Sequence, residues 1–509
     1  MLAERSGQVR ILLPILLLLM VSMPGVAGPA QPKVLKVALG SDTSNLGPAF
    51  STGGPDRTRY FLMFDTIIDY GPGMKMRGRL ATGWRPVSPK VMEMTLRRGV
   101  KFHNGDTFTA RDVKANVEWI LDPANRAAAR AFVANVERVE IVDDYTVRWH
   151  SSEAMPTFGN TLIDRFFFYP ASYLARVGPA GFGRQPIGSG PYKFVEWIPG
   201  QRLVVEAHPG YWEGRPGYDR VEVYPIQEAS TRAVAILAGD VDMIEQPPIE
   251  YTQRLRAARD LKVVVYPELA IVMLVMNTKM KPLDDVRIRR AIHYAVNIDQ
   301  ILTSVLGGLG KKNTGLLLEG VPGHNPNLKP YEYSPDKARA LLREAGYPDG
   351  FPLKIYTPVG RYFQDVQMAE AVAGFLTAVG IKAQVIAYEY ANLVRALAGN
   401  PMLDGMFLIG NTQFTLDPAG TYQGYIWKEF RGVYYSRPDL DEMGRQARTE
   451  MDPRKREQLY QRMEEIVWSD AFILPLTRRT NVVVMKRTVE FTPREADYYY
   501  LGEAKPANP

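Results

Sequence analysis

The sequence contains no cysteine and only five histidines in its 509 residues. Without cysteine the chain can form neither a disulfide framework nor a thiolate metal site, and it has no cysteine nucleophile and no cysteine to carry a lipid after a signal segment. The histidines are too scattered for any short metal-ligand spacing, and no HExxH motif occurs. We therefore predict no metal site and no cofactor.

The sequence also lacks a hydrophobic run long enough to cross a bilayer as a helix, which takes about 20 residues. Its most apolar segment, Ile11 to Val21, follows Arg5 and Arg10 and precedes the small residues Gly25 to Ala27. This order is typical of a signal peptide, so we expect residues 1–27 to be cleaved on export. Export without a lipid favours the periplasm of a Gram-negative bacterium, with no stable membrane insertion. An uncleaved N-terminal anchor is the alternative.

Long blocks of like charge are absent, although the formal net charge is +7. Arginines mostly alternate with acids, so no basic track is available for a phosphate backbone, and nucleic-acid binding is not predicted. A GxSxG elbow is absent as well, which leaves a nucleophilic serine without local support. The glycine-rich stretch Gly307 to Gly315 has Val305 where a P-loop needs its first glycine, and glycines that end a helix explain it better.

What the sequence does contain is an alternation of strand and helix patterns in a chain too long for a single hydrophobic core. Strands are predicted at 34–39, 92–97, 145–149, 381–387, 472–476 and 482–485. Helix starts are marked by a capping box of Thr109 with Asp112, by Asn297, by Ser334 with Pro335 and by Asp452 with Pro453. The pattern predicts an α/β protein of at least two lobes.

One long block resembles the signature of the bacterial extracellular solute-binding proteins of the dipeptide, oligopeptide and nickel type: LRRGVKFHNGDTFTARDVKANVEWILDP, residues 96–123. Further family motifs follow in the family's order, namely GSGPYKFVEW (188–197), HPGYW (208–212), MNTKMKPLDDVRIRRAIHYAVNIDQIL (276–302) and YSPDKARALLREAGYPDGFPL (333–353). The resemblance covers essentially the whole mature chain. It implies a two-lobed periplasmic-binding-protein fold of type II, the Venus-flytrap form, with an extra subdomain in the first lobe.

The resemblance also implies a domain organisation. Lobe I would comprise residues 32–70, 188–275 and 482–509, the extra subdomain residues 71–187, and lobe II residues 276–481. Crossings near Val275 and Val482 would form the hinge. Because a ligand contacts both lobes only in the closed state, its binding favours closure, and the permease subunits of an ABC importer recognise that shape. The implied protein is a monomeric, non-catalytic receptor for a small solute: a peptide-like, opine-like or other polar anionic metabolite.

The arginine that pairs with the ligand's C-terminal carboxylate in dipeptide-binding members is matched by Arg361 in TPVGRYFQD. A guanidinium can bind a carboxylate through two parallel hydrogen bonds, although a solvent-facing loop arginine is the alternative. Tyr362 and Phe363 beside it could stack on the ligand or pack the lobe. In the loop that follows the first strand, Asn45 is a further candidate contact.

Peptide-binding members carry an aspartate for the ligand's amino group three residues before an Asp-Pro pair, and this chain has Phe414 at that place. A phenyl ring cannot replace a carboxylate, so we hypothesise a ligand with an anionic end and little dependence on a free amine. Asp417 of the Asp-Pro pair is the remaining acid, although such a residue more often caps a helix or turn. The other candidate contacts in this segment are Asn411, Thr412, Gln413, Tyr422 and Tyr425.

Two other classes of function stay open from the residues alone. A periplasmic glycoside hydrolase could use aromatic side chains and paired carboxylates in a cleft, but the sequence has no marked acid pair for it. A sensor or chaperone would share the fold and differ in its partner. Turnover assays on sugars separate the enzyme from a receptor, because a receptor binds without forming product.

Overall fold

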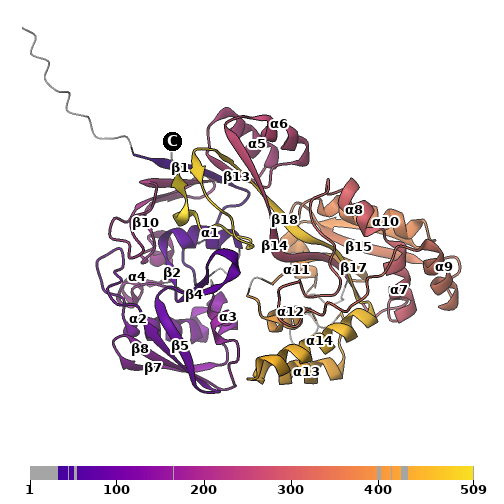
Figure 1. Ribbon diagram of the computed structural model, residues 1–509, viewed down its shortest axis with the longest axis horizontal. Helices are drawn as coiled ribbons and strands as arrows, with labels where there is room; N and C mark the ends of the chain where they lie inside the picture. The colour runs from indigo at the N-terminus through magenta and orange to yellow at the C-terminus, as the bar shows by residue number, and fades with distance from the viewer. Residues whose placement is uncertain are drawn as a thin grey trace, which may run out of the picture.

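The computed structural model describes residues 32–43, 45–50, 54–163, 166–397, 403–413, 415–425 and 434–507. These residues form two lobes that lie side by side and are joined by two long strands, β14 (Leu261–Met276) and β18 (Ile473–Lys486), as Figure 1 shows. The predicted signal peptide lies outside the described residues. Among the described residues, none of the helices is both long and apolar enough to cross a membrane.

A ten-stranded sheet runs through both lobes. On the side of the first lobe β1 is parallel to β12 and β13, and on the side of the second lobe β15 is parallel to β16 and β17. Parallel neighbours end at the same edge of a sheet, so the loops that follow them lie together. The strand order is β10 (Tyr192–Ile198), β11 (Arg202–Ala207), β12 (Arg220–Pro225), β1 (Val34–Leu39), β13 (Met243–Glu245), β18, β14, β17 (Gly405–Thr412), β15 (Pro352–Pro358) and β16 (Lys382–Tyr388).

The two joining strands change partners midway. The pairing of β14 with β18 shifts register between Pro267 and Ile271, opposite Thr480 and Arg478. On one side of this break β18 also pairs with β13, and on the other side β14 also pairs with β17. The lobe boundaries expected near residues 275 and 482 stay a prediction, while the register break marks where the shared strands pass from one lobe to the other.

The first lobe carries a separate four-stranded antiparallel sheet within the segment expected to form the extra subdomain. Its order is β5 (Ala81–Ser88), β6 (Val91–Leu96), β8 (Thr146–Ser151) and β7 (Val136–Asp143). Smaller pairs are formed by β2 (Asp65–Thr66) with β9 (Phe167–Phe168), β3 (Ile68–Tyr70) with β4 (Met76–Gly78), and β19 (Val489–Glu490) with β20 (Lys505–Pro506).

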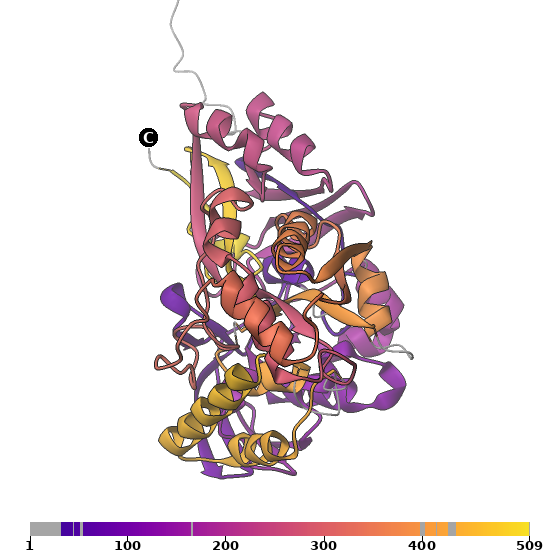
Figure 2. The ribbon, with the colours of Figure 1, turned by 90° about the vertical axis from the view of Figure 1, so that its right-hand side faces the viewer.

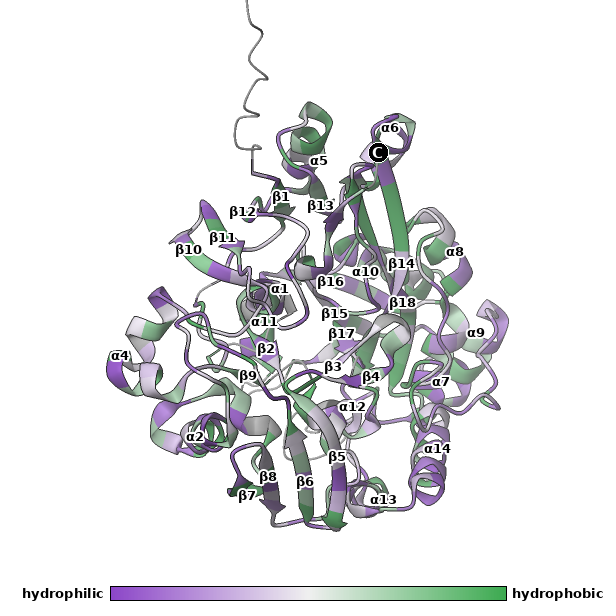
Figure 3. Ribbon diagram, turned by 60° about the vertical axis from the view of Figure 1, so that its left-hand side comes forward, coloured by the Kyte–Doolittle hydropathy of each residue, from purple (hydrophilic) through white to green (hydrophobic). Residues whose placement is uncertain are grey.

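Helices cover the sheets in both lobes. Figure 2 shows α13 and α14 beside the extra subdomain, with α5 and α6 at the opposite end of the molecule. In Figure 3 β14 is largely hydrophobic, whereas α14 is mostly hydrophilic on its visible face. The helices of the first lobe and its subdomain are α1 (Gly54–Met63), α2 (Ala110–Leu121), α3 (Phe158–Leu162), α4 (Ala171–Arg184), α5 (Ala229–Ala238) and α6 (Thr252–Ala257). Those of the second lobe are α7 (Val286–Ala295), α8 (Ile298–Ser304), α9 (Pro335–Glu344), α10 (Asp365–Thr377), α11 (Tyr390–Leu397), α12 (Pro418–Tyr425), α13 (Pro438–Thr449) and α14 (Pro453–Asp470).

The predicted helix starts are confirmed, and each has a side-chain cap. Thr109 and Asp112 form a capping box at α2, and Asn297, Ser334 and Asp452 accept hydrogen bonds from backbone N–H groups at the starts of α8, α9 and α14. The prediction of two separate strands at 472–476 and 482–485 is wrong, because the polar residues between them continue to pair with β14 in one strand.

A buried carboxylate organises the interior of the second lobe. Glu464 of α14 is fully buried, and its Oε1 accepts hydrogen bonds from the backbone N–H groups of Leu316 and Leu317 at 2.6 and 2.8 Å. Its Oε2 accepts a hydrogen bond from the Tyr422 hydroxyl at 3.0 Å. Two backbone N–H groups and one hydroxyl therefore bind the Glu464 carboxylate. Burial raises the pKa of Glu464 to about 7.

We expect Glu464→Gln to change how stability depends on pH. In the folded protein the pKa of Glu464 is about 7, against 4.5 for the free side chain, so the folded state keeps this proton to a higher pH. The wild type therefore loses stability through this group as pH rises from 4.5 to 7, because only its folded state still binds the proton. Glutamine does not titrate, so the stability of the variant relative to wild type should rise by about 2–3 kcal/mol between pH 4.5 and 8. Urea denaturation of both proteins across this range measures the difference, and a constant difference would contradict the assignment.

Candidate ligand-binding site

The loop between β15 and α10 carries Arg361 at the edge of the sheet that faces the space between the lobes. Its backbone is fixed by Asp365, whose carboxylate accepts hydrogen bonds from the N–H groups of Gly360, Arg361 and Tyr362 at 3.2, 2.9 and 3.0 Å. Burial raises the pKa of Asp365 despite these bonds. Asp365 thus acts on Arg361 by shaping its loop.

The Arg361 side chain lies against two aromatic rings. Its guanidinium carbon is 5.3 Å from the centroid of the Tyr362 ring and 5.2 Å from that of Tyr390, which is the range of a cation–π contact. Burial alone would lower the pKa of Arg361, but the two phenols and Asp497 outweigh it, and the pKa is raised. The side chain therefore stays positively charged at any physiological pH.

Two other arginines near Arg361 already have acidic partners. Arg479 Nη1 lies 2.9 Å from Glu268 Oε2 at the register break between the antiparallel strands β14 and β18, and Arg57 Nη2 lies 2.7 Å from Asp497 Oδ1. Glu268 is 1% exposed, and burial raises its pKa to about 7. Among the described residues no carboxylate oxygen is within 4.0 Å of the Arg361 guanidinium. Arg361 is thus a positive group without a close acidic partner in this part of the chain.

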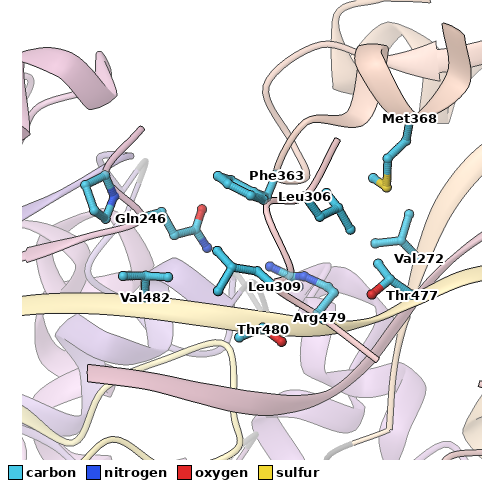
Figure 4. Close-up of a pocket in the computed structure, with 12 residues that line it drawn as sticks. Gln246, Val272, Leu306, Leu309, Phe363, Met368, Thr477, Arg479, Thr480 and Val482 are labelled. Atoms are coloured by element: carbon cyan, nitrogen blue, oxygen red, sulfur yellow. The ribbon is translucent and has the colours of Figure 1, made fainter. Parts of the chain in front are cut away.

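A small pocket next to these charges, here called the hinge pocket, is lined by both lobes. Figure 4 shows Gln246 and Val482 from the first lobe facing Phe363, Leu306 and Leu309 from the second, with Arg479 among them. Most of its walls are apolar, and Arg479 is its charged group. The predicted contact Phe363 lies in this pocket.

Tyr362 points the other way, into the core of the second lobe. It is 5% exposed, and its ring packs so closely on Gly410 of β17 that a Cβ there would lie 2.6 Å from Tyr362 Cε1. Tyr362 therefore supports Arg361 from behind, and the aromatic side chain available to a ligand in this loop is that of Phe363.

A larger cavity, here called the distal cavity, lies between the extra subdomain and the second lobe. It encloses about 1660 Å³, including its opening to solvent. Asn135, Thr157 and Asn160 line it from the first lobe, and Thr412, Thr415 and Asp417 line it from the second. Thr412, the last residue of β17, is exposed, whereas its neighbours Asn411 and Gln413 are buried. Of these three consecutive residues, Thr412 faces the space between the lobes.

The lobes are tied together at this cavity by hydrogen bonds to the segment Thr415 to Asp417. The Tyr70 hydroxyl and Asn160 Nδ2 donate to the Thr415 carbonyl at 2.6 and 2.7 Å. Thr157 Oγ1 donates to Asp417 Oδ2 at 2.6 Å. The two lobes are therefore in direct contact on this side of the cavity.

Asp417 also accepts hydrogen bonds from residues of its own lobe. Its Oδ1 accepts hydrogen bonds from Arg456 Nη2 at 2.5 Å and from the N–H of Ala419, at the start of α12, at 3.0 Å. Asp417 is thus a helix cap, as the alternative interpretation of the Asp-Pro pair proposed, and in addition one half of a largely buried ion pair.

Three other predicted ligand contacts are buried and make hydrogen bonds within the second lobe. Gln413 is 1% exposed and bonds through its amide to the backbone of Leu316 and Leu318, and Tyr422 is fully buried against Glu464. Asn411 is 6% exposed and accepts a hydrogen bond from Thr421. The structure thus places these three side chains inside the lobe with intramolecular hydrogen bonds, and their contact with a ligand stays a prediction.

The remaining predicted ligand contacts are Asn45, which the structure describes, and Phe414 and Tyr425, whose side chains it does not describe. Asn45 accepts a hydrogen bond from the N–H of Gly47 at 2.6 Å, which closes a tight turn, and it lies against Gly183 of α4. Phe414 and the side chain of Tyr425 lie outside the described residues. Sequence reasoning missed Glu268 and Arg479. The signal for Arg479 is the polar stretch TRRTN (477–481) between two apolar runs, and that for Glu268 is a single acid within the otherwise apolar segment 263–276.

The two lobes, the shared strands and the charged space between them define a two-lobed binding protein. The model of the family "Bacterial extracellular solute-binding proteins, family 5 Middle" matches residues 75–429, more than half of the chain. The chain therefore belongs to family 5 of the bacterial extracellular solute-binding proteins, as its motifs predicted.

Individual relatives agree with this assignment. The glutathione-binding protein GsiB of Shigella boydii is 28% identical over 467 residues, which cover 87% of this chain and 88% of GsiB. The periplasmic binding protein DppA of Helicobacter pylori, solved with the peptide STSA, is 25% identical with a TM-score of 0.80, covering 93% of this chain and 98% of DppA. The substrate-binding protein CtaP of Listeria monocytogenes, 21% identical, shares the fold with a TM-score of 0.85 over 93% of this chain and 99% of CtaP.

These findings confirm the predicted class of function. The protein is the substrate-binding component of an ABC transport system, and it binds a small solute between lobes of the periplasmic-binding-protein type. Its relatives are solute-binding proteins, so the glycan-active enzyme considered as an alternative is not favoured.

Proposed function

We propose that the protein captures a small solute through a carboxylate that Arg361 binds, and that it delivers this solute to the permease by lobe closure. The observation that carries the proposal is the state of Arg361: charged, supported by Tyr362 and Tyr390, and without a carboxylate within ion-pair distance among the described residues. A desolvated cation of this kind favours an anionic ligand group. Glutathione, named for the relative GsiB, and the peptide STSA bound to DppA both carry free carboxylates.

The charges around Arg361 support one anionic group. Arg57 and Arg479 each have an acidic partner, Asp497 and Glu268, whereas no carboxylate oxygen lies within 4.0 Å of Arg361 among the described residues. One ligand carboxylate would give Arg361 a partner as well. A second anion at the same place would be repelled by the two resident acids.

The ligand's amino group has less support. The position at which peptide-binding members carry an aspartate is Phe414 in this chain, and Asp417 is bonded to Arg456, Ala419 and Thr157. We therefore propose a ligand that does not depend on a free amine, such as a modified peptide, an opine-like conjugate or another polar metabolite.

The proposal also concerns the export of the protein and its oligomeric state. We propose a cleaved signal peptide at residues 1–27, a periplasmic protein without a lipid anchor, and a monomer that meets the permease subunits without catalysing a reaction. Incubation with candidate ligands should raise the melting temperature and leave each ligand chemically unchanged on chromatography.

Calorimetry with blocked peptides tests the ligand proposal. The probes are a dipeptide, its N-acetyl form and its C-terminal amide, with the three matching forms of glutathione. Blocking the amine should leave the affinity nearly unchanged, whereas blocking the C-terminal carboxylate should weaken binding by about tenfold or more. The reverse order would contradict the proposal.

A further inference from the structure

The second lobe contains a further pocket, here called the side pocket, which shares no lining residue with the hinge pocket or the distal cavity. Its volume is about 520 Å³ including the opening to solvent, in the range of small-molecule sites. The lining comes from α7, α8, α14, the second-lobe end of β18 and the loop between α8 and α9, namely residues 293, 296–299, 312–314, 330, 331, 333, 468, 474 and 475. No described residue of the first lobe contributes to it, so binding there needs no lobe closure.

Three aromatic side chains meet in the wall of the side pocket. The centroid of the His293 ring lies 4.4 Å from that of Tyr331 and 5.3 Å from that of Trp468. The Tyr331 hydroxyl donates a hydrogen bond to the Trp468 carbonyl at 3.3 Å, and Trp468 Nε1 donates one to the Lys329 carbonyl at 2.8 Å. Because these two polar atoms are already bonded, Tyr331 and Trp468 offer a ligand their apolar ring surface.

His293 supplies a polar atom that lacks a partner. The side chain is 3% exposed, and its Nε2 has no hydrogen-bond partner among the described residues. Burial lowers the pKa of His293 to about 3, although backbone hydrogen bonds to Ile473 and Ala471 act to raise it, so the ring is neutral at physiological pH. Bonds that favour the charged ring are donated by it, which assigns the proton to Nδ1 and leaves Nε2 as an acceptor. A buried acceptor without a donor is unfavourable, and a ligand that donates to it would remove this cost.

The charges and amides of the lining already have partners. Asn297 accepts a hydrogen bond from a backbone N–H group, and Asn313 donates to backbone carbonyls. Lys312 Nζ lies 2.5 Å from Asp299 Oδ2, so the two charged side chains of the described lining pair with each other. This pair leaves no net charge to attract an ion, and the apolar walls favour a neutral ligand.

The surroundings of the side pocket favour a small molecule over a protein partner. Among the described residues of the lining, Tyr333 is the only large apolar side chain that is exposed. A stable protein interface buries about 800 Å² on each partner around an apolar centre. One exposed ring beside a charge pair does not provide such a surface.

We propose that the side pocket is a second binding site, which takes a small neutral phenol whose ring packs on Tyr331 and Trp468 and whose hydroxyl donates a hydrogen bond to His293 Nε2. The need for a ring follows from the aromatic walls, and the need for a hydroxyl follows from the acceptor without a partner. A phenol has a pKa of about 10, so it stays neutral at physiological pH. This site is separate from Arg361 and does not depend on the function proposed above.

Isothermal titration calorimetry of the intact protein with two probes tests the inference. 4-Methylphenol carries the ring and the hydroxyl, and toluene has the same ring and methyl group without the hydroxyl. His293→Phe keeps an aromatic ring in the wall and removes Nε2. Tyr333→Ala removes an exposed ring of the lining, so it tests the site without risk to the core. His150→Phe is the matched control, since His150 pairs with Glu140 in the extra subdomain.

4-Methylphenol should bind the wild type about tenfold more tightly than toluene, because the phenol satisfies Nε2 and toluene does not. His293→Phe should remove this difference between the probes, and Tyr333→Ala should weaken both by about threefold. His150→Phe should change neither affinity. Arg361→Ala, which is expected to weaken a ligand held between the lobes, should not weaken the phenol.

Equal binding of the two probes would overturn the inference. So would a loss of phenol binding in Arg361→Ala with none in His293→Phe, because the phenol would then lie between the lobes. Failure of 4-methylphenol to bind at millimolar concentration would also overturn it and would leave water as the partner of Nε2.

A third probe distinguishes a free phenol from a tyrosine side chain. N-acetyltyrosinamide should bind more weakly than 4-methylphenol, because its two amides would lose water against apolar walls. Tighter binding of this probe would assign the site to a tyrosine of a protein partner and overturn the small-molecule assignment. None of these outcomes decides the carboxylate proposal, which the blocked peptides test.

Discussion

Replacing Arg361 by alanine is expected to weaken the binding of carboxylate ligands by about 30-fold or more, because removing one partner of a desolvated charge pair costs roughly 2–5 kcal/mol. The loss should appear mainly as faster dissociation. Isothermal titration calorimetry of the wild type and the variant with the same ligand measures the affinity, and stopped-flow fluorescence measures the rates.

Two further variants define what the Arg361 result means. Arg361→Lys keeps the charge but loses the planar two-pronged donor, so it should recover only part of the affinity. Arg445→Ala is the matched control, because Arg445 is an exposed arginine of α13 whose partner Glu442 lies on the same helix. Unchanged affinity in Arg361→Ala would show that Arg361 is not the carboxylate-binding residue.

Replacing Asp417 by alanine is expected to lower the free energy of unfolding of the second lobe by about 3–5 kcal/mol. The reason is the partner that remains: the Arg456 side chain is 8% exposed, and without Asp417 its charge is buried and unpaired. The start of α12 also loses its cap, and Thr157 loses the acceptor that joins the lobes. Urea denaturation followed by tryptophan fluorescence measures the change.

Asp417→Asn separates these contributions. Asparagine keeps an oxygen for the cap and for Thr157 but loses the charge, so its stability should lie between those of the wild type and the alanine variant. Asp336→Ala is the control, because the Asp336 side chain is 97% exposed and its ion pair with Arg339 contributes little. If Asp417→Ala leaves stability unchanged and reduces only ligand affinity, Asp417 is a ligand contact and not a structural residue.

The sequence by itself determined the local structure and the class of the protein. Helix starts at Thr109, Asn297, Ser334 and Asp452 were predictable because a capping side chain bonds to backbone groups within three residues of it. Strand β1 was predictable for a similar reason, since its short run of apolar residues is contiguous in the chain. The family followed from motifs that are contiguous in the chain.

Only the tertiary structure decided which polar residues face the cavity between the lobes. Asn411, Thr412 and Gln413 are adjacent and chemically alike, yet one of them faces the cleft and the other two bond inside the lobe. The partners that fix this choice, Thr421, Leu316 and Leu318, lie on other segments, up to 97 residues away. The same holds for Glu268 and Arg479, which meet only because β14 and β18 pair across more than two hundred residues. Local patterns encode strands and caps, whereas burial and pairing depend on contacts that form only when distant segments come together.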